Sequence, residues 1–143
     1  MSDTSPLRGL AQVNLSAENV AEARDWYSRF LGVQPYFQQP DAESPAYVEF
    51  RLGDYQHELG IIDRRYLPPA STAEPTGAIV RWHVDDVAAT MEGLIGLGAT
   101  VHEPATERGE GFVTASVVDP FGNILGVMYS PHYLSTLEHP APA

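Results

Sequence analysis

Apolar and polar residues alternate in several short stretches of the chain, and one longer stretch follows a helical period. The alternation in residues 11–16 predicts a half-buried strand. Residues 20–31 carry apolar side chains at helical spacing between Asn19, which fits an N-cap, and Gly32, which fits a C-terminal stop. Three further segments predict strands: Gln34–Gln39, Ala46–Leu52 and Gln56–Ile62.

The same order of elements returns after residues 64–77, a connector that contains three prolines. Alternation in residues 79–84 predicts a strand, and a helix follows between a cap at Asp85 or Asp86 and a stop at Gly98. The remaining strands are predicted near Thr100–Glu103, Phe112–Val118 and Ile124–Tyr129.

The two halves also match residue by residue. The Val13-x-Leu15 pattern returns as Val80-x-Trp82, and the Leu59–Ile62 segment returns near Leu125. The repeat predicts an α+β fold of two tandem β-α-β-β-β modules. We expect a single domain over residues 1–143, made of module one (about 9–63), a linker (64–77), module two (about 78–130) and a C-terminal tail (131–143) that is frayed at its end.

One face of each predicted sheet is covered by a helix, and the other is bare. We expect the bare faces to curve into one cup-shaped mixed sheet, lined by the residues of opposite parity to the apolar ones. These are Gln12, Asn14, Tyr47, Glu49, Arg51, Glu58, Ile62, Arg81, His83 and Met128. His57 points away from the cup by the same parity, and His102, His132 and His139 fall in loop or tail contexts without an assigned role.

Composition removes several classes of chemistry. The 143 residues include no cysteine, and all 8 basic residues are arginine, which excludes disulfides, thiolate metal sites and Schiff-base lysines. A formal charge of −11 argues against nucleic acid. This charge serves either plain solubility or attraction of a cationic ligand. No apolar run approaches the ~20 residues of a membrane span, and no secretory segment is evident, so we expect a cytoplasmic protein.

Each polar candidate has a structural role as an alternative to a functional one. Arg81 and Glu58 either bind a ligand or form a structural salt bridge across the cup floor. His83 serves either as an acid or base, or as an inert hydrogen-bonded residue at the rim. Glu49 and Glu58, on adjacent strands, are candidates for a carboxylate pair.

Two glycines and one loop add to the candidate site. Gly60 and Gly126 either allow a backbone or a ligand to approach closely, or mark a bulge or a helix contact. The loop of residues 107–112, with two glycines and three charges, is a candidate lid over the cup, where Arg108 either meets an anion or stays solvated.

Two motifs are similar to those of a known superfamily. The helix end Asp25-Trp26-Tyr27-x3-Leu31-Gly32-Val33 and the turn Val118-Asp119-Pro120-Phe121-Gly122-Asn123 resemble the vicinal oxygen chelate superfamily. That superfamily includes glyoxalase I, extradiol dioxygenases, fosfomycin-resistance enzymes and bleomycin-binding proteins. The resemblance covers residues 9–130 and implies the two-module fold, often as a homodimer.

The resemblance also implies four metal-ligand positions, and most of them are unsuited to a metal here. They fall on Gln12, Ile79, Gly126 and Gly60, with Glu58 two residues from the last. A hard divalent cation needs several oxygen or imidazole ligands, which one amide, one isoleucine and two glycines do not supply. We therefore expect no metal cofactor.

The leading hypothesis is a metal-free member of this superfamily that holds a small organic ligand in the cup. It either sequesters the ligand or catalyses a lyase or isomerase step. The candidate catalytic residues are His83 and Glu58, and the candidate ligand-binding residues are Gln12, Asn14, Tyr47, Glu49, Arg81 and Met128. One alternative is a glyoxalase- or dioxygenase-like metalloenzyme with displaced ligands, drawn from Gln12, Glu49, Glu58 and His83. Another is an interaction module whose cup holds a partner chain.

Overall fold

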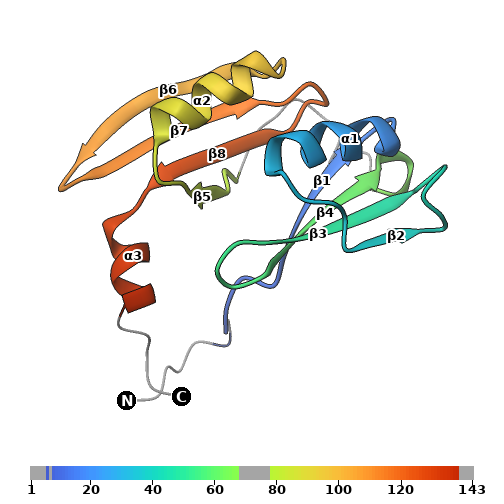
Figure 1. Ribbon diagram of the computed structural model, residues 1–143, viewed down its shortest axis with the longest axis horizontal. Coiled ribbons are helices and arrows are strands. Elements are labelled where there is room, and N and C mark those ends of the chain that lie inside the picture. The colour runs from blue at the N-terminus through green and yellow to red at the C-terminus, as the bar shows by residue number, and fades with distance from the viewer. Residues whose placement is uncertain (1–5, 7, 68–77, 139–143) are drawn as a thin grey trace. The chain divides into compact units, whose positions relative to one another are not determined.

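The computed structural model describes residues 6, 8–67 and 78–138, and the chain divides into two compact units, Met1–Pro68 and Pro69–Ala143 (Figure 1). Unit one contains β1 (Gln12–Ala17), α1 (Val20–Leu31), β2 (Phe37–Gln39), β3 (Tyr47–Leu52), β4 (His57–Asp63) and the 3-10 turn η1 (Arg64–Tyr66). Unit two contains β5 (Arg81–His83), α2 (Val87–Gly96), β6 (Thr100–Gly109), β7 (Phe112–Val118), β8 (Ile124–Tyr129) and α3 (Pro131–Glu138).

Both units have the same sheet topology, which confirms the predicted repeat and the α+β fold class. The strand order is β1-β4-β3-β2 in the first unit and β5-β8-β7-β6 in the second. In each unit the first strand pairs in parallel with the last strand, and the other pairs are antiparallel. The fold therefore consists of two open, four-stranded mixed sheets.

Helix α1 begins and ends at the predicted residues for identifiable reasons. The Asn19 side chain accepts a hydrogen bond from the backbone N–H of Glu22 at 3.0 Å, which satisfies one of the free donors of the first turn. Gly32 ends the helix with a φ of 71°, in the left-handed region that glycine enters without steric cost. The buried face of α1 packs on the sheet, and the core of unit one joins Val20, Ala23, Trp26 and Tyr27 to Leu15, Val48, Phe50, Leu59 and Ile61.

Helix α2 repeats this arrangement in unit two. Asp86, rather than Asp85, is the cap, because its side chain accepts from the backbone N–H of Ala89 at 3.0 Å. The buried residues of α2 pack over the second sheet, and the core there consists of Val87, Met91, Leu94, Ala115, Val117, Leu125 and Val127.

Strand lengths differ from the prediction in several places. Strands β2 and β5 have three residues each, fewer than expected, whereas β6 continues to Gly109 and joins β7 through a tight hairpin. Residues 107–109 therefore belong to β6, and the loop predicted over residues 107–112 is reduced to a turn at residues 110–111. Arg108 is held within the unit, since its Nε donates to Thr114 Oγ1 at 3.0 Å.

The C-terminal segment forms a helix that the sequence analysis did not assign. Pro131 occupies the first position of α3, where a missing N–H costs nothing. Ser130 precedes it, and its hydroxyl accepts from the backbone N–H of Tyr133 at 3.1 Å. Residues 139–143, where a frayed end was predicted, and residues 68–77 of the predicted linker lie outside the described part of the chain.

No helix in residues 8–67 or 78–138 combines the length and the apolar character that a membrane crossing requires.

Candidate functional site

The sheet of unit one presents its polar residues on the face opposite α1, as the parity of the strands predicts. Strand pairing arranges this face in three cross-strand rows. The first row holds Arg51, Glu58 and Gln12, the second Phe37, Glu49, Gly60 and Asn14, and the third Gln39, Tyr47, Ile62 and Ser16. The candidates of module one thus share one surface, which we call the open face of unit one.

Gln12 is the centre of a hydrogen-bonded network on this face. Its amide nitrogen lies 2.9 Å from Tyr47 Oη, 3.2 Å from Glu58 Oε1 and 3.5 Å from Glu49 Oε1. Its carbonyl oxygen accepts from Asn14 Nδ2 at 3.2 Å. The structure therefore brings together five of the predicted site residues, and we call them the Gln12 network.

The two carboxylates of the network share a cation. The Arg51 guanidinium lies 3.9 Å from Glu49 Oε2 and 3.6 Å from Glu58 Oε2. Its Cζ atom lies 3.8 Å from the ring centroid of Tyr36, which the sequence analysis did not single out. Glu49 and Glu58, the candidate carboxylate pair, lie in neighbouring rows and share Gln12 and Arg51 as partners, so that a guanidinium compensates their charge.

Tyr47 connects this network to its surroundings as a neutral group. Its hydroxyl donates to Glu49 Oε1 at 2.9 Å and accepts from Gln12. Burial, the hydrogen bond to Glu49 and the charges of Glu49 and Glu58 raise the pKa of Tyr47 far above its ordinary value. The phenol therefore stays protonated at physiological pH and cannot serve there as a base.

Gly60 leaves the space that this arrangement needs. A Cβ atom at residue 60 would lie 2.5 Å from Asn14 Oδ1 and 2.6 Å from Tyr47 Oη. Of the two explanations offered for this glycine, close approach is the one observed, and the approaching groups are side chains of the same unit.

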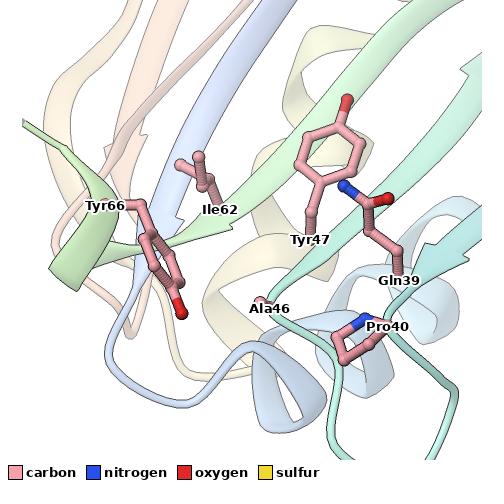
Figure 2. A pocket seen from close by; sticks show the side chains of 6 residues that line it. All are labelled: Gln39, Pro40, Ala46, Tyr47, Ile62 and Tyr66. Carbon is pink, nitrogen blue, oxygen red and sulfur yellow. The ribbon is translucent and has the colours of Figure 1, made fainter.

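A pocket of about 320 Å³ adjoins the network at the third row (Figure 2). Figure 2 shows Tyr66 on one side, Tyr47, Gln39 and Pro40 on the other, and Ile62 between them. The lining residues are Gln39, Pro40, Ala46, Tyr47, Ile62 and Tyr66.

The sequence analysis missed four of these lining residues, namely Gln39, Pro40, Ala46 and Tyr66. Gln39 was placed in a strand but not tested for the face it presents, although strand parity puts it beside Tyr47. Pro40 follows that strand directly. Tyr66 lies in a segment assigned as a connector, and no periodic signal marks a side chain in an irregular turn.

In unit two, Arg81 forms its ion pair with a residue that was not expected. Arg81 NH2 lies 2.8 Å from Glu103 Oε1, and its NH1 donates to the Ala115 carbonyl oxygen at 3.0 Å. Arg81 and Glu58, offered as partners in one of the two alternatives, thus each have an ion-pair partner within their own sheet. Strand β6 is the fourth strand in the order β5-β8-β7-β6, and the register places Glu103 in the same cross-strand row as Arg81, Gly126 and Ser116.

Glu103 is held as a carboxylate by its neighbours. Hydrogen bonds from Arg81 and from the Ser116 hydroxyl, at 2.8 Å each, lower the pKa of Glu103 below its ordinary value. His102, on β6 rather than in a loop, places its Nδ1 atom 2.8 Å from the same hydroxyl.

We expect Glu103→Gln to lower the free energy of unfolding at neutral pH. A depressed carboxyl pKa stabilises the folded state above the ordinary pKa of 4.5, and this contribution disappears as the pH falls through the folded-state value. The difference between wild type and variant should therefore shrink in urea titrations taken from neutral pH down to about pH 3. Glu107→Gln, an exposed position on the same strand, is the control. A difference that is independent of pH would contradict this account.

His83 is engaged in holding the C-terminal helix. Its Nδ1 atom accepts the backbone N–H of Ser130 at 3.0 Å, so the neutral ring carries its proton on Nε2. Nε2 is buried, lacks a hydrogen-bond partner among the described residues and lies 3.5 Å from Asp85 Oδ1. The ring stacks on Tyr133 with centroids 4.8 Å apart. This geometry favours the structural alternative for His83.

Met128 and Gly126 lie on the same face of the second sheet as Arg81 and His83. The register pairs Arg81 with Gly126 and His83 with Met128. A Cβ atom at residue 126 would lie 2.5 Å from the Val80 carbonyl oxygen, so here the close approach is between two backbones.

The metal-ligand positions implied by the superfamily do not fit a metal ion. Ile79 and Gly126 offer no donor side chain, and the space beside Gly60 is filled by Asn14 and Tyr47. Gln12 directs its amide nitrogen at both nearby carboxylates, which already face Arg51. Within the described ranges, no group of three or more His, Cys, Asp or Glu side chains is arranged to hold a metal ion.

Comparison with known proteins identifies the fold. A family model described as the Glyoxalase/Bleomycin resistance protein/Dioxygenase superfamily matches residues 9–127. No curated protein matches the chain. Among solved structures, it is similar to a glyoxalase-related enzyme from Fulvimarina pelagi, with a TM-score of 0.67, 23% identity, and coverage of 87% of this chain and 90% of the other.

Two further structures show the same fold at lower identity. One is a glyoxalase / bleomycin resistance protein from Catenulispora acidiphila, with a TM-score of 0.60, 18% identity, and coverage of 86% of this chain and all of the other (100%). The second is a fosfomycin resistance protein from Listeria monocytogenes, with a TM-score of 0.65, 12% identity, and coverage of 87% and 94%.

Proposed function

Because the chain belongs to the glyoxalase/bleomycin resistance protein/dioxygenase superfamily, we propose that it binds a small organic molecule on the open face of unit one without a metal ion. The observation that carries this proposal is the pocket of about 320 Å³ beside the Gln12 network. Small-molecule sites are mostly apolar pockets with a few fixed polar groups. Tyr47 lines the pocket and also belongs to the polar Gln12 network, so it connects the two.

The geometry favours binding over turnover. A general acid or base needs a titratable group that can reach the ligand and exchange a proton with it. His83 is buried and uses Nδ1 to hold Ser130. Glu58 is engaged by Gln12 and Arg51. Both candidate catalytic residues therefore have structural partners, which supports sequestration of the ligand.

The candidates of unit two remain candidate ligand-binding residues of their own sheet. Arg81 and Met128 lie on the corresponding face of the second sheet, and Arg81 keeps one guanidinium nitrogen bonded to Glu103 and another to Ala115. We propose that residues 1–143 form a single domain. We also propose that the protein is a cytoplasmic homodimer. Light scattering tests the oligomeric state, because a dimer has twice the chain mass of 15.6 kDa.

A ligand screen on paired variants tests the site. Gln39→Trp places a large ring at the exposed edge of the pocket, where it should fill the space without disturbing the core. Gln34→Trp, at another exposed position before β2, is the matched control. We expect molecules that raise the melting temperature of the wild type to bind the Gln39 variant about tenfold more weakly, a loss of about 1.4 kcal/mol. Hits that bind all three proteins equally would refute the site.

One observation favours the metalloenzyme alternative, namely the convergence of Gln12, Glu49 and Glu58. Elemental analysis of untagged protein from a metal-supplemented culture separates the two functions. The metal-free proposal predicts far less than one equivalent of iron, nickel, manganese or zinc, and ligand binding that is unchanged by chelation. A full equivalent that disappears in Glu58→Gln would establish displaced ligands instead.

A further inference from the structure

Among the residues that the structure describes, none that lines the pocket beside the Gln12 network is charged. It is lined by one proline, one alanine, one isoleucine, two tyrosines and one glutamine. A charged ligand that enters such a pocket loses hydration and gains no counter-charge, which is costly. The lining therefore favours an uncharged ligand.

The charges nearest the pocket are already compensated. Asp63, next to Ile62, holds Arg65 through a bidentate contact with distances of 2.9 and 3.1 Å. Glu49, below Tyr47, accepts the phenol proton and faces Arg51. A cationic ligand was one of the two explanations offered for the formal charge of −11. The acidic side chains named here already have basic partners, so they do not favour a cationic ligand at this pocket.

The apolar walls suit a flat ring. Tyr66 and Tyr47 flank the pocket from opposite sides (Figure 2). Both hydrogen-bonding functions of the Tyr47 hydroxyl are engaged within the network, so this residue offers mainly its ring to a ligand. The Arg65 Cζ atom lies 5.6 Å from the Tyr66 ring centroid, but Tyr66 is 64% exposed and so retains ring surface on which a ligand can stack. A volume of about 320 Å³ lies at the lower end for small-molecule sites and suits one or two fused rings.

Gln39 supplies the polar contact. Its side-chain amide forms no hydrogen bond with another of the described residues, and it lines the pocket beside Tyr47. An amide offers two donors and an acceptor, which pair best with a ligand edge that presents a carbonyl and an N–H together.

We infer that the ligand of this pocket is an uncharged, planar aromatic compound with a carboxamide-like edge, its ring held between Tyr66 and Tyr47 and its edge bonded to Gln39. This inference rests on the proposed binding function and narrows it to one ligand class. Tyr66 and Gln39 become the residues that determine specificity.

Three probes that share a naphthalene ring and carry a neutral, an anionic or a cationic substituent test the inference by isothermal titration calorimetry: 2-naphthamide, 2-naphthoate and 2-naphthylmethylammonium. We expect the amide to bind about tenfold or more tightly than either ion. Tyr66→Leu should weaken amide binding about tenfold through lost stacking, and Gln39→Ala about fivefold through lost hydrogen bonds. Tyr55→Leu and Gln34→Ala, at exposed positions outside the pocket, should leave the affinity unchanged.

Each contrary outcome overturns a defined statement. Equal or tighter binding of an ion, with the same dependence on Tyr66 and Gln39, overturns the ligand class and leaves the site intact. If 2-naphthamide binds the Tyr66→Leu and Gln39→Ala variants as tightly as the wild type, neither residue determines specificity. If none of the probes binds while the Gln39→Trp screen still finds ligands, the ligand class is wrong and the proposed function stands. If the screen also fails, both are wrong.

Discussion

Gly126→Ala is expected to destabilise unit two by about 3 kcal/mol, the upper end for an overpacked interior. The new Cβ atom would lie 2.5 Å from the Val80 carbonyl oxygen, which accepts the hydrogen bond from the residue 126 N–H at 3.0 Å. Because a backbone atom cannot rotate away as a side chain can, β5 must separate from β8. Urea denaturation with an unchanged m-value measures the loss.

Two other glycines provide comparisons for this variant. Gly60→Ala collides with the ends of the Asn14 and Tyr47 side chains, which can move, so we expect a loss of only about 1 kcal/mol together with a disturbed Gln12 network. Gly93→Ala, in α2 with no atom within 4 Å of the added Cβ, should stabilise the protein by about 0.5–1 kcal/mol. If Gly126→Ala were as stable as wild type, the close pairing of β5 with β8 would be wrong.

Truncating the core should cost still more. Phe50→Ala in unit one is expected to lose about 3–5 kcal/mol and Leu94→Ala in unit two about 2–5 kcal/mol, because both side chains are fully buried and leave cavities. Glu92→Ala, exposed on α2, should change stability by less than about 0.5 kcal/mol.

Each unit contains one tryptophan, so fluorescence can follow the units separately. Trp26 lies in α1 and Trp82 in β5. In the single-tryptophan variants Trp26→Phe and Trp82→Phe, a single cooperative domain predicts that Phe50→Ala lowers both denaturation midpoints equally. A shift confined to the Trp26 signal would mean that the units unfold independently, and the single-domain proposal would be rejected.

The sequence predicts best what depends on local chemistry. The start of α1 at Asn19 and its end at Gly32 follow from capping, which involves residues at most four positions apart. Strands β7 and β8 were predicted with their observed bounds because both are short, mostly apolar segments that the turn at residues 119–123 separates. The internal repeat then predicted that both modules share one topology, as the structure confirms. Local patterns alone do not predict topology.

The missed features depend on distant neighbours or irregular backbone. Strand β6 carries register shifts at three places, and these interrupt the alternation that would have revealed its full length. Glu103 was inside the predicted strand, but its pairing with Arg81 depends on the strand order and register of the sheet, which bring the two residues into one cross-strand row. Tyr66 belongs to a short turn without period, so its place in the pocket follows only from the folded unit.

The pairing of β1 with β4 has a consequence for synthesis of the chain. Gln12 and Glu58, which pair across these strands, lie 46 residues apart, so β1 emerges long before its partner exists. At about 5–20 residues per second, this wait lasts roughly 2–9 seconds on the ribosome. The same delay separates β5 from β8 in unit two. Each nascent module thus exposes an unpaired strand until its last strand is synthesised. During this interval the exposed strand is most accessible to binding by a chaperone or by a misfolded neighbouring chain.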